Sequence, residues 1–218
     1  MKIKVCGLRD PENITSVLDQ KVDYVGFIFY DKSKRFAGNT QLAEWLTDNE
    51  ELFQDTAKVG VFVNAELDII LNTVHDYQLD YVQLHGDESP GYCRELNLLW
   101  SASTLRKASL AKAFSIDANF DFSDTDAYAD TCKLFVFDTG GKGEPGGTGV
   151  KWDWDKLSEY KGATPFLLSG GIGPDDAVRV QFVEHPQLAG LDLNSKFETA
   201  PGVKNIDELG QFLGRLRR

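Results

Sequence analysis

The chain has 218 residues, of which 42% are hydrophobic and 11% aromatic, enough to bury a core without disulfides or a structural metal. Asp and Glu outnumber Lys and Arg by 34 to 23, and a formal net charge of −11 argues against a nucleic-acid-binding protein. An acidic chain can still carry a local positive site, so these numbers leave room for a small anionic ligand.

Short apolar runs alternate with segments of helical periodicity along the whole chain. Eight runs are predicted to be strands: Ile3–Cys6, Tyr24–Phe29, Ala57–Val63, Tyr81–Leu84, Leu98–Ser101, Leu134–Asp138, Phe166–Ser169 and Leu188–Leu193. Several of these runs are apolar at successive positions, which is typical of parallel strands covered on both faces.

Helices are predicted between these strands. Their ranges are Pro11–Gln20, Gln41–Leu46, Glu66–Tyr77, Pro90–Leu96, Asp153–Tyr160, Pro174–Val183 and Asn205–Leu216. Pro11 suits the first position of a helix, and Asp153 and Asn205 suit the capping position. The helical pattern of Leu105–Lys133 fades after Phe114 into a polar stretch, so we expect a degenerate or irregular fifth helix region there.

No linker or break in composition divides the chain, which predicts a single α/β domain over residues 1–218. Eight strand–helix units fit either a closed (β/α)₈ TIM barrel or an open doubly wound sheet. An open nucleotide-binding sheet would carry Gly-x-Gly-x-x-Gly after its first strand, and the sequence Cys6-Gly7-Leu8-Arg9-Asp10-Pro11 lacks that pattern. We therefore predict the closed barrel, although 218 residues is at the short end of its range.

The sequence predicts a soluble cytoplasmic protein with no membrane partner. The three cysteines are an odd number without framework spacing, which is typical of reduced thiols. The first residues lack the apolar core of a secretory signal. The longest apolar runs, such as Val25–Tyr30, are far shorter than the roughly 18 residues that a membrane helix needs.

Reactive and polar side chains gather at the predicted carboxyl ends of the strands, where barrel enzymes keep their functional groups. Those that can carry chemistry are Cys6, Arg35, His85, Asp138 and Asp192. Each has an ordinary structural interpretation as well. Free cysteine is commonly a small buried hydrophobe, carboxylates cap turns and helices, and a loop arginine is often only solvated. We assign no catalytic role to His85.

Turns of glycine or small polar residues follow three consecutive strands. They are Gly146-Gly147-Thr148-Gly149, Ser169-Gly170-Gly171 and, with no glycine of its own, Asn194-Ser195. Glycine lets bare backbone N–H groups approach an anion, and barrels commonly bind phosphate after strands seven and eight. Tight turns also use glycine for conformational reasons alone. Together the three turns favour a phosphate site.

An ordered set of motifs covers seven of the eight units. The motifs are Lys4-Val5-Cys6-Gly7-Leu8, Val25-Gly26-Phe27-Ile28-Phe29, Ser33-Lys34-Arg35, Val59-Gly60-Val61-Phe62-Val63-Asn64, Val82-Gln83-Leu84-His85-Gly86-Asp87-Glu88, Phe137-Asp138-Thr139, Gly146-Gly147-Thr148-Gly149, Asp153-Trp154, Leu168-Ser169-Gly170-Gly171, Leu191-Asp192-Leu193-Asn194-Ser195 and Pro201-Gly202-Val203-Lys204. In these motifs the chain resembles phosphoribosylanthranilate isomerase, a (β/α)₈ enzyme of tryptophan biosynthesis. Lys196 is a departure, because the family usually has glycine there.

The resemblance implies an aldose–ketose isomerase that acts on a phosphorylated small molecule without cofactor or metal. By resemblance, Cys6 is the general base and Asp138 the general acid. Arg35 pairs with the substrate carboxylate and Asp192 with a ribose hydroxyl. Phosphate is held by Gly147, Gly170, Gly171, Asn194 and Ser195. We expect a monomer or homodimer.

Two other functions fit the same pattern. One is the related barrel isomerase of histidine biosynthesis, which acts on a bis-phosphorylated substrate. That family has Asp where this chain has Cys6 and a phosphate turn in each half, whereas the first half here lacks a Gly-Gly turn. The other is a catalytically silent barrel that only binds a phosphorylated metabolite or a protein. The presence of Cys6, Asp138 and Arg35 argues against it.

Overall fold

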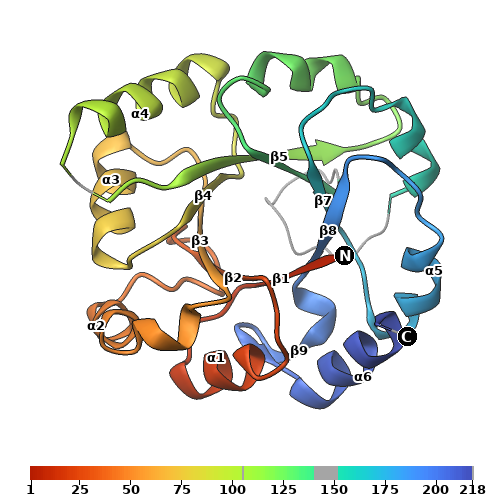
Figure 1. Cartoon of the computed structure of the whole chain (residues 1–218), viewed down its shortest axis with the longest axis horizontal. Helices are drawn as coiled ribbons and strands as arrows, with labels where there is room; N and C mark the ends of the chain where they lie inside the picture. Colours follow the sequence, from red (N-terminus) through yellow and green to blue (C-terminus); the bar gives the residue numbers. More distant parts are fainter. Residues whose placement is uncertain (105, 140–151, 218) are drawn as a thin grey trace.

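Eight parallel strands close into a barrel in the computed structural model, which describes residues 1–104, 106–139 and 152–217 (Figure 1). The strands are β1 (Lys2–Cys6), β2 (Tyr24–Ile28), β3 (Ala57–Phe62), β4 (Tyr81–Leu84), β5 (Ser109–Ile116), β6 (Leu134–Thr139), β7 (Phe166–Leu168) and β8 (Leu188–Leu193). Each pairs with the next, and β1 also pairs with β8. The predicted (β/α)₈ fold class is confirmed.

Helices surround the strands (Figure 1). The α-helices are α1 (Pro11–Leu18), α2 (Thr40–Asp48), α3 (Leu67–Asp76), α4 (Pro90–Ala102), α5 (Ala177–Gln181) and α6 (Ile206–Leu216). Short 3₁₀ helices are η1 (Glu50–Phe53), η2 (Phe122–Tyr128), η3 (Trp154–Glu159), η4 (Pro174–Asp176) and η5 (Ser195–Phe197). Only η2 lies between β5 and β6, which confirms the irregular fifth helix region. The helix predicted over Asp153–Tyr160 is the 3₁₀ helix η3.

The strand predicted at Leu98–Ser101 is wrong, because these residues lie in the last turns of α4. A short apolar run fits a buried strand and a helix equally well. Here Cys93, Leu96 and Trp100 are buried at helical spacing, whereas Leu98 is 69% exposed. The run is therefore the edge of an amphipathic helix.

The fifth strand is β5, within the segment where the sequence pattern was weak. Its Ala111 and Ala113 point into the barrel and pack with Leu134, Val136 and Leu167. Small alanines fill that narrow interior, and the buried Lys112 interrupts the apolar run. Both features dilute the hydrophobic signal of a strand that makes six paired positions with β6.

Successive residues of β1 face opposite sides of the sheet, as in any strand. Ile3 and Val5 join the apolar layer between strands and helices. Lys4 and Cys6 alternate with them and are buried inside the barrel. This alternation places an ammonium and a thiol in the interior.

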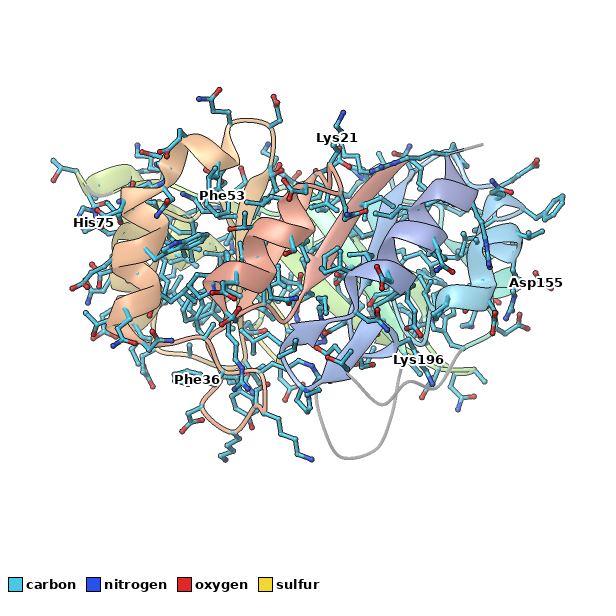
Figure 2. The ribbon with its side chains drawn as sticks, turned by 90° about the horizontal axis from the view of Figure 1, so that it is seen from below. Lys21, Phe36, Phe53, His75, Asp155 and Lys196 are labelled. Carbon is cyan, nitrogen blue, oxygen red and sulfur yellow. The ribbon has the colours of Figure 1, made fainter. Side chains whose placement is uncertain are left out.

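Figure 2 views the molecule from the side of the barrel, with Phe36 and Lys196 toward one end and Lys21 and Phe53 toward the other. Phe36 follows β2 and Lys196 follows β8, so their end holds the carboxyl ends of the strands. No helix among the described residues is both long and apolar enough to cross a membrane.

Candidate active site

A cavity of about 470 Å³ opens at the carboxyl ends of the strands. The structure places eight of the nine predicted site residues in its walls: Cys6, Arg35, Asp138, Gly170, Gly171, Asp192, Asn194 and Ser195. The ninth, Gly147, lies outside the described residues. Side chains that are up to 189 positions apart in the sequence therefore meet in one space because the barrel closes.

Cys6 is the last residue of β1 and is buried. Lys4, two residues earlier, points to the same side, and its Nζ lies 2.9 Å from Oδ2 of Asp192. Burial raises the pKa of the Cys6 thiol, and the neighbouring Lys4 ammonium opposes that rise. In the free protein Cys6 is therefore a protonated thiol beside a cation that would stabilise its thiolate.

Asp138 lies near the end of β6 and is also buried. Its Oδ1 accepts a 2.8 Å hydrogen bond from the Thr139 N–H, and its Oδ2 lies 3.4 Å from Nε2 of His85. Burial alone would raise the pKa of this carboxyl, but His85, the Thr139 N–H and Ser169 together hold it below its usual value. Asp138 is therefore ionised in the free protein.

His85 contributes more to the site than the sequence indicated. Nε2 of Gln83 lies 2.9 Å from Nδ1 of His85. If the amide nitrogen donates this bond, the imidazole proton is on Nε2 and faces Asp138. The position of His85 at the end of β4 was the only sequence signal for such a contact.

Arg35, in the loop after β2, is held by a partner that the sequence did not single out. Its Nε lies 2.9 and 3.0 Å from the two carboxylate oxygens of Glu198, and its Nη2 lies 2.7 Å from Oε2. Glu198 in turn lies 2.7 Å from Nζ of Lys204. Lys204 belongs to the Pro201–Lys204 motif, but no role was predicted for it.

Asp192 is the deepest of the predicted ligand-binding groups. Its Oδ2 is bound to Lys4, whereas its Oδ1 is buried and has no hydrogen-bond partner among the described residues. Burial raises the pKa of this carboxyl although Lys4 opposes it. An unpaired buried oxygen beside a cavity is a natural acceptor for a ligand hydroxyl.

The turn after β7 has the backbone that an anion site needs. Gly170 and Gly171 have φ angles of +93° and +67°, which only glycine adopts readily. A side chain at Gly170 would crowd Thr139 and would start 3.1 Å from Oδ1 of Asp138, so the turn lies close to the buried carboxylate. Ser195 begins η5 in the next unit.

Among the residues that the structure describes, no three His, Cys, Asp or Glu side chains are grouped so that they could hold a metal ion. The site consists instead of a thiol, carboxylates, paired cations and a glycine turn. That set suits proton transfer on an anionic ligand.

A sequence model described as N-(5'phosphoribosyl)anthranilate (PRA) isomerase matches residues 3–215. The chain belongs to this family. It is similar to curated N-(5'-phosphoribosyl)anthranilate isomerases, with 45% identity to that of Parabacteroides distasonis, covering 99% of this chain and 93% of that protein. Identity to the enzyme of Phocaeicola vulgatus is 38%, covering 100% and 98%. The chain is thus an isomerase.

Solved structures agree with this membership. The phosphoribosyl anthranilate isomerase of Thermus thermophilus superimposes with a TM-score of 0.82 at 23% identity, covering 100% of this chain and 98% of that one, which shows the fold. A second isomerase of the family was solved in complex with reduced 1-(o-carboxyphenylamino)-1-deoxyribulose 5-phosphate. It matches with a TM-score of 0.75 at 26% identity, covering 100% and 98%.

Proposed function

We propose that Cys6 and Asp138 carry out the Amadori rearrangement of N-(5-phosphoribosyl)anthranilate to 1-(2-carboxyphenylamino)-1-deoxyribulose 5-phosphate in tryptophan biosynthesis. Family membership gives the reaction. The observation that supports the assignment of residues is that β1 and β6, on different sides of the barrel, bring a thiol and a carboxyl into the wall of one cavity.

The rearrangement needs one acid and one base and no redox step. Asp138 donates a proton to the ring oxygen as the C1–O bond breaks, which leaves an iminium ion. Cys6 then removes the proton from C2, so that the electron pair forms an enol-amine. This intermediate tautomerises to the ketone product.

The free protein favours the opposite protonation pattern, with Cys6 protonated and Asp138 ionised. A phosphate bound at Gly170 would bring negative charge next to Asp138 and raise its pKa. Lys4 offers the cation that stabilises a Cys6 thiolate. Substrate binding therefore favours a protonated Asp138, whereas the Lys4 ammonium favours the thiolate of Cys6 with or without substrate.

The other predicted residues bind the two ends of the substrate in this proposal. Arg35 pairs with the anthranilate carboxylate, since a guanidinium binds a carboxylate through two N–H groups. The free Oδ1 of Asp192 accepts a ribose hydroxyl. Gly147, Gly170, Gly171, Asn194 and Ser195 bind the phosphate in this proposal.

A second cavity, at the ends of β3 to β5, bears on the bis-phosphorylated alternative. Its buried cation is Lys112, whose Nζ lies 2.7 Å from the Gly86 carbonyl oxygen and 3.4 Å from Oε2 of Glu88. A cation that is already neutralised gives little attraction for a second phosphate. This arrangement favours the substrate with one phosphate.

The test is an assay that follows the loss of fluorescence of freshly made phosphoribosylanthranilate. Wild-type protein is expected to turn the substrate over, and Cys6→Ala to lower kcat by about 10²- to 10⁴-fold, the range for a lost general base. Cys93→Ala is the matched control, because Cys93 is a buried thiol on α4. Turnover by Cys6→Ala at the wild-type rate would remove Cys6 as the base.

The remaining sequence predictions extend this function. An enzyme that acts on a phosphorylated intermediate of amino-acid biosynthesis is expected in the cytoplasm. Its partner is then a small-molecule substrate and not a nucleic acid. The related Thermotoga maritima isomerase is described as dimeric. We propose a monomer or homodimer for this chain, which analytical ultracentrifugation would distinguish.

A further inference from the structure

Glu198 lies behind Arg35, and its side chain is only 4% exposed. Its carboxylate binds the Nε and Nη2 groups of Arg35 at 2.7 to 3.0 Å and accepts a 3.2 Å bond from the Gly202 N–H. These contacts use one edge of the guanidinium. The Nη1 edge of Arg35 therefore remains available to a ligand in the cavity, which the Arg35 side chain lines.

Lys204 links this carboxylate to the turn after β8. Its Nζ is wholly buried and lies 2.7 Å from Oε1 of Glu198 and 2.8 Å from Oδ1 of Asn194. Because the Asn194 oxygen faces the ammonium, the amide Nδ2 is the donor left for an anion in the cavity. One cation thus contacts both the carboxylate behind Arg35 and a residue of the proposed phosphate site.

The net charge of Arg35, Glu198 and Lys204 determines how strongly this group attracts an anion. Arg35 and Lys204 are positive and Glu198 is negative, so the group presents one net positive charge. Burial lowers the pKa of Lys204 and Glu198 opposes that fall, whereas Arg35 and Lys204 hold the pKa of Glu198 below its usual value. Without Lys204, the Arg35–Glu198 pair is neutral and attracts an anion less.

The unit is held rigidly by neighbouring elements. Glu198 and Lys204 belong to a two-stranded hairpin, β9 (Glu198–Ala200) and β10 (Val203–Lys204). Asn13 of α1 binds the backbone N–H and carbonyl of Lys204 at 2.8 and 3.0 Å. At Gly7, with φ +81°, a side chain would lie 2.7 Å from both Cδ of Arg35 and Oδ1 of Asn194.

We propose that Glu198 and Lys204 are a positioning pair for the two anionic ends of the substrate. Glu198 orients Arg35 toward the carboxylate, and Lys204 keeps that arm positively charged while it orients Asn194 toward the phosphate. Neither residue touches the reacting atoms. The proposal rests on the proposed function, because it assigns both ends to one phosphorylated aromatic amine.

The test measures KM, kcat and the inhibition constants of anthranilate and inorganic phosphate. Glu198→Gln is expected to raise KM and weaken anthranilate inhibition by about tenfold each, with kcat within about threefold of wild type. Phosphate inhibition is expected to weaken less than anthranilate inhibition, because Glu198 reaches Asn194 only through Lys204. Lys204→Met is expected to weaken inhibition by both probes by about tenfold.

Glu159→Gln is the matched control, since Glu159 is an exposed residue that pairs with Lys156 and does not line the cavity. It should leave all four constants unchanged. A loss of kcat alone in Glu198→Gln, or inhibition constants within twofold of wild type in both variants, would overturn the proposal. If Glu198→Gln does not fold, Lys204→Met carries the test by itself.

A second readout separates this proposal from the proposed function. If the wild-type protein shows no turnover, the proposed function fails, and the Arg35 Nε–H signal in an NMR spectrum decides about the pair. Slow exchange of that proton in wild type and fast exchange in Glu198→Gln supports the positioning role. Equal exchange in both overturns it.

Discussion

Cys6 has room at the end of β1 because the residue facing it on β2 is glycine. A side chain at Gly26 would start 2.8 Å from Sγ of Cys6, closer than real contacts allow. The strands pair at Cys6 and Gly26, so this contact is set by the register of the barrel. Glycine at position 26 therefore leaves space for the Cys6 thiol, in addition to fitting the pairing of the two strands.

Asp138 lies near a glycine as well, because a side chain at Gly170 would crowd Thr139 and start 3.1 Å from Oδ1 of Asp138. We expect Asp138→Asn to lower kcat by about 10²- to 10⁴-fold, because an amide cannot transfer a proton as an acid at neutral pH. Binding of a reduced product analogue is expected to persist. Steady-state kinetics and calorimetric titration measure the two effects separately.

Asp130→Asn is the control for that variant, since Asp130 is exposed and lies just before β6. It should match wild type in both measurements. Retained turnover in Asp138→Asn would assign the acid role to another group, and the first to examine is His85, whose Nε2 faces the same carboxylate.

At the scale of elements, seven of the eight predicted strands coincide with observed ones to within one residue at each end. They could be predicted because their apolar residues are consecutive and bounded by turns. β5 was not predicted because its residues inside the barrel are Ala111 and Ala113. These side chains are buried but small, so the strand lacks a strong hydrophobic pattern. A local hydrophobic pattern reveals large apolar side chains, and it misses a buried strand whose interior residues are small.

The residues of the site also divide into those that the sequence predicts and those that it does not. Cys6, Asp138 and Arg35 are found in motifs at strand ends, so their motifs and the strand order together bring them into one cavity. Glu198 and Lys204 lie beyond β8, in a hairpin whose fold toward Arg35 depends on tertiary contacts with α1. Sequence order alone gives no reason to join residue 198 to residue 35.

The corrected end of α4 makes a direct prediction about stability. Leu96 is fully buried, whereas Leu98 is 69% exposed. Leu96→Ala is expected to lower the free energy of unfolding by about 2–5 kcal/mol, and Leu98→Ala by less than about 0.5 kcal/mol. Denaturant unfolding of both variants measures this difference. Equal losses would contradict the helical assignment of Leu98.

At the scale of the whole molecule, the barrel closes where β1 meets β8. Lys4 pairs in register with Asp192 at that seam, and their side chains form the buried ion pair inside the barrel. Because the first strand joins the last directly, we propose that residues 1–218 form one domain. The ion pair links the site to the closure of the fold.

This pair predicts a pH-dependent cost of losing Lys4. In Lys4→Met, the buried Asp192 carboxyl loses the cation that opposes the rise of its pKa, so its pKa rises further. A carboxyl with a raised folded-state pKa adds stability that is full below its unfolded value of roughly 3.9 and lost as pH rises through the folded value. We expect a loss of about 3–5 kcal/mol in free energy of unfolding near neutral pH.

As pH falls toward the unfolded-state pKa of roughly 3.9, the loss should shrink, because Asp192 is then increasingly protonated and no longer needs a cation. Urea titrations of wild type and Lys4→Met, near neutral pH and at acidic pH, compare the loss in free energy of unfolding. The double variant Lys4→Met/Asp192→Asn has no carboxylate at the seam, so its loss relative to wild type should vary less with pH. An equal loss for Lys4→Met at both pH values would contradict the prediction, because it would show that the cost does not arise from the charge of Asp192 left without Lys4.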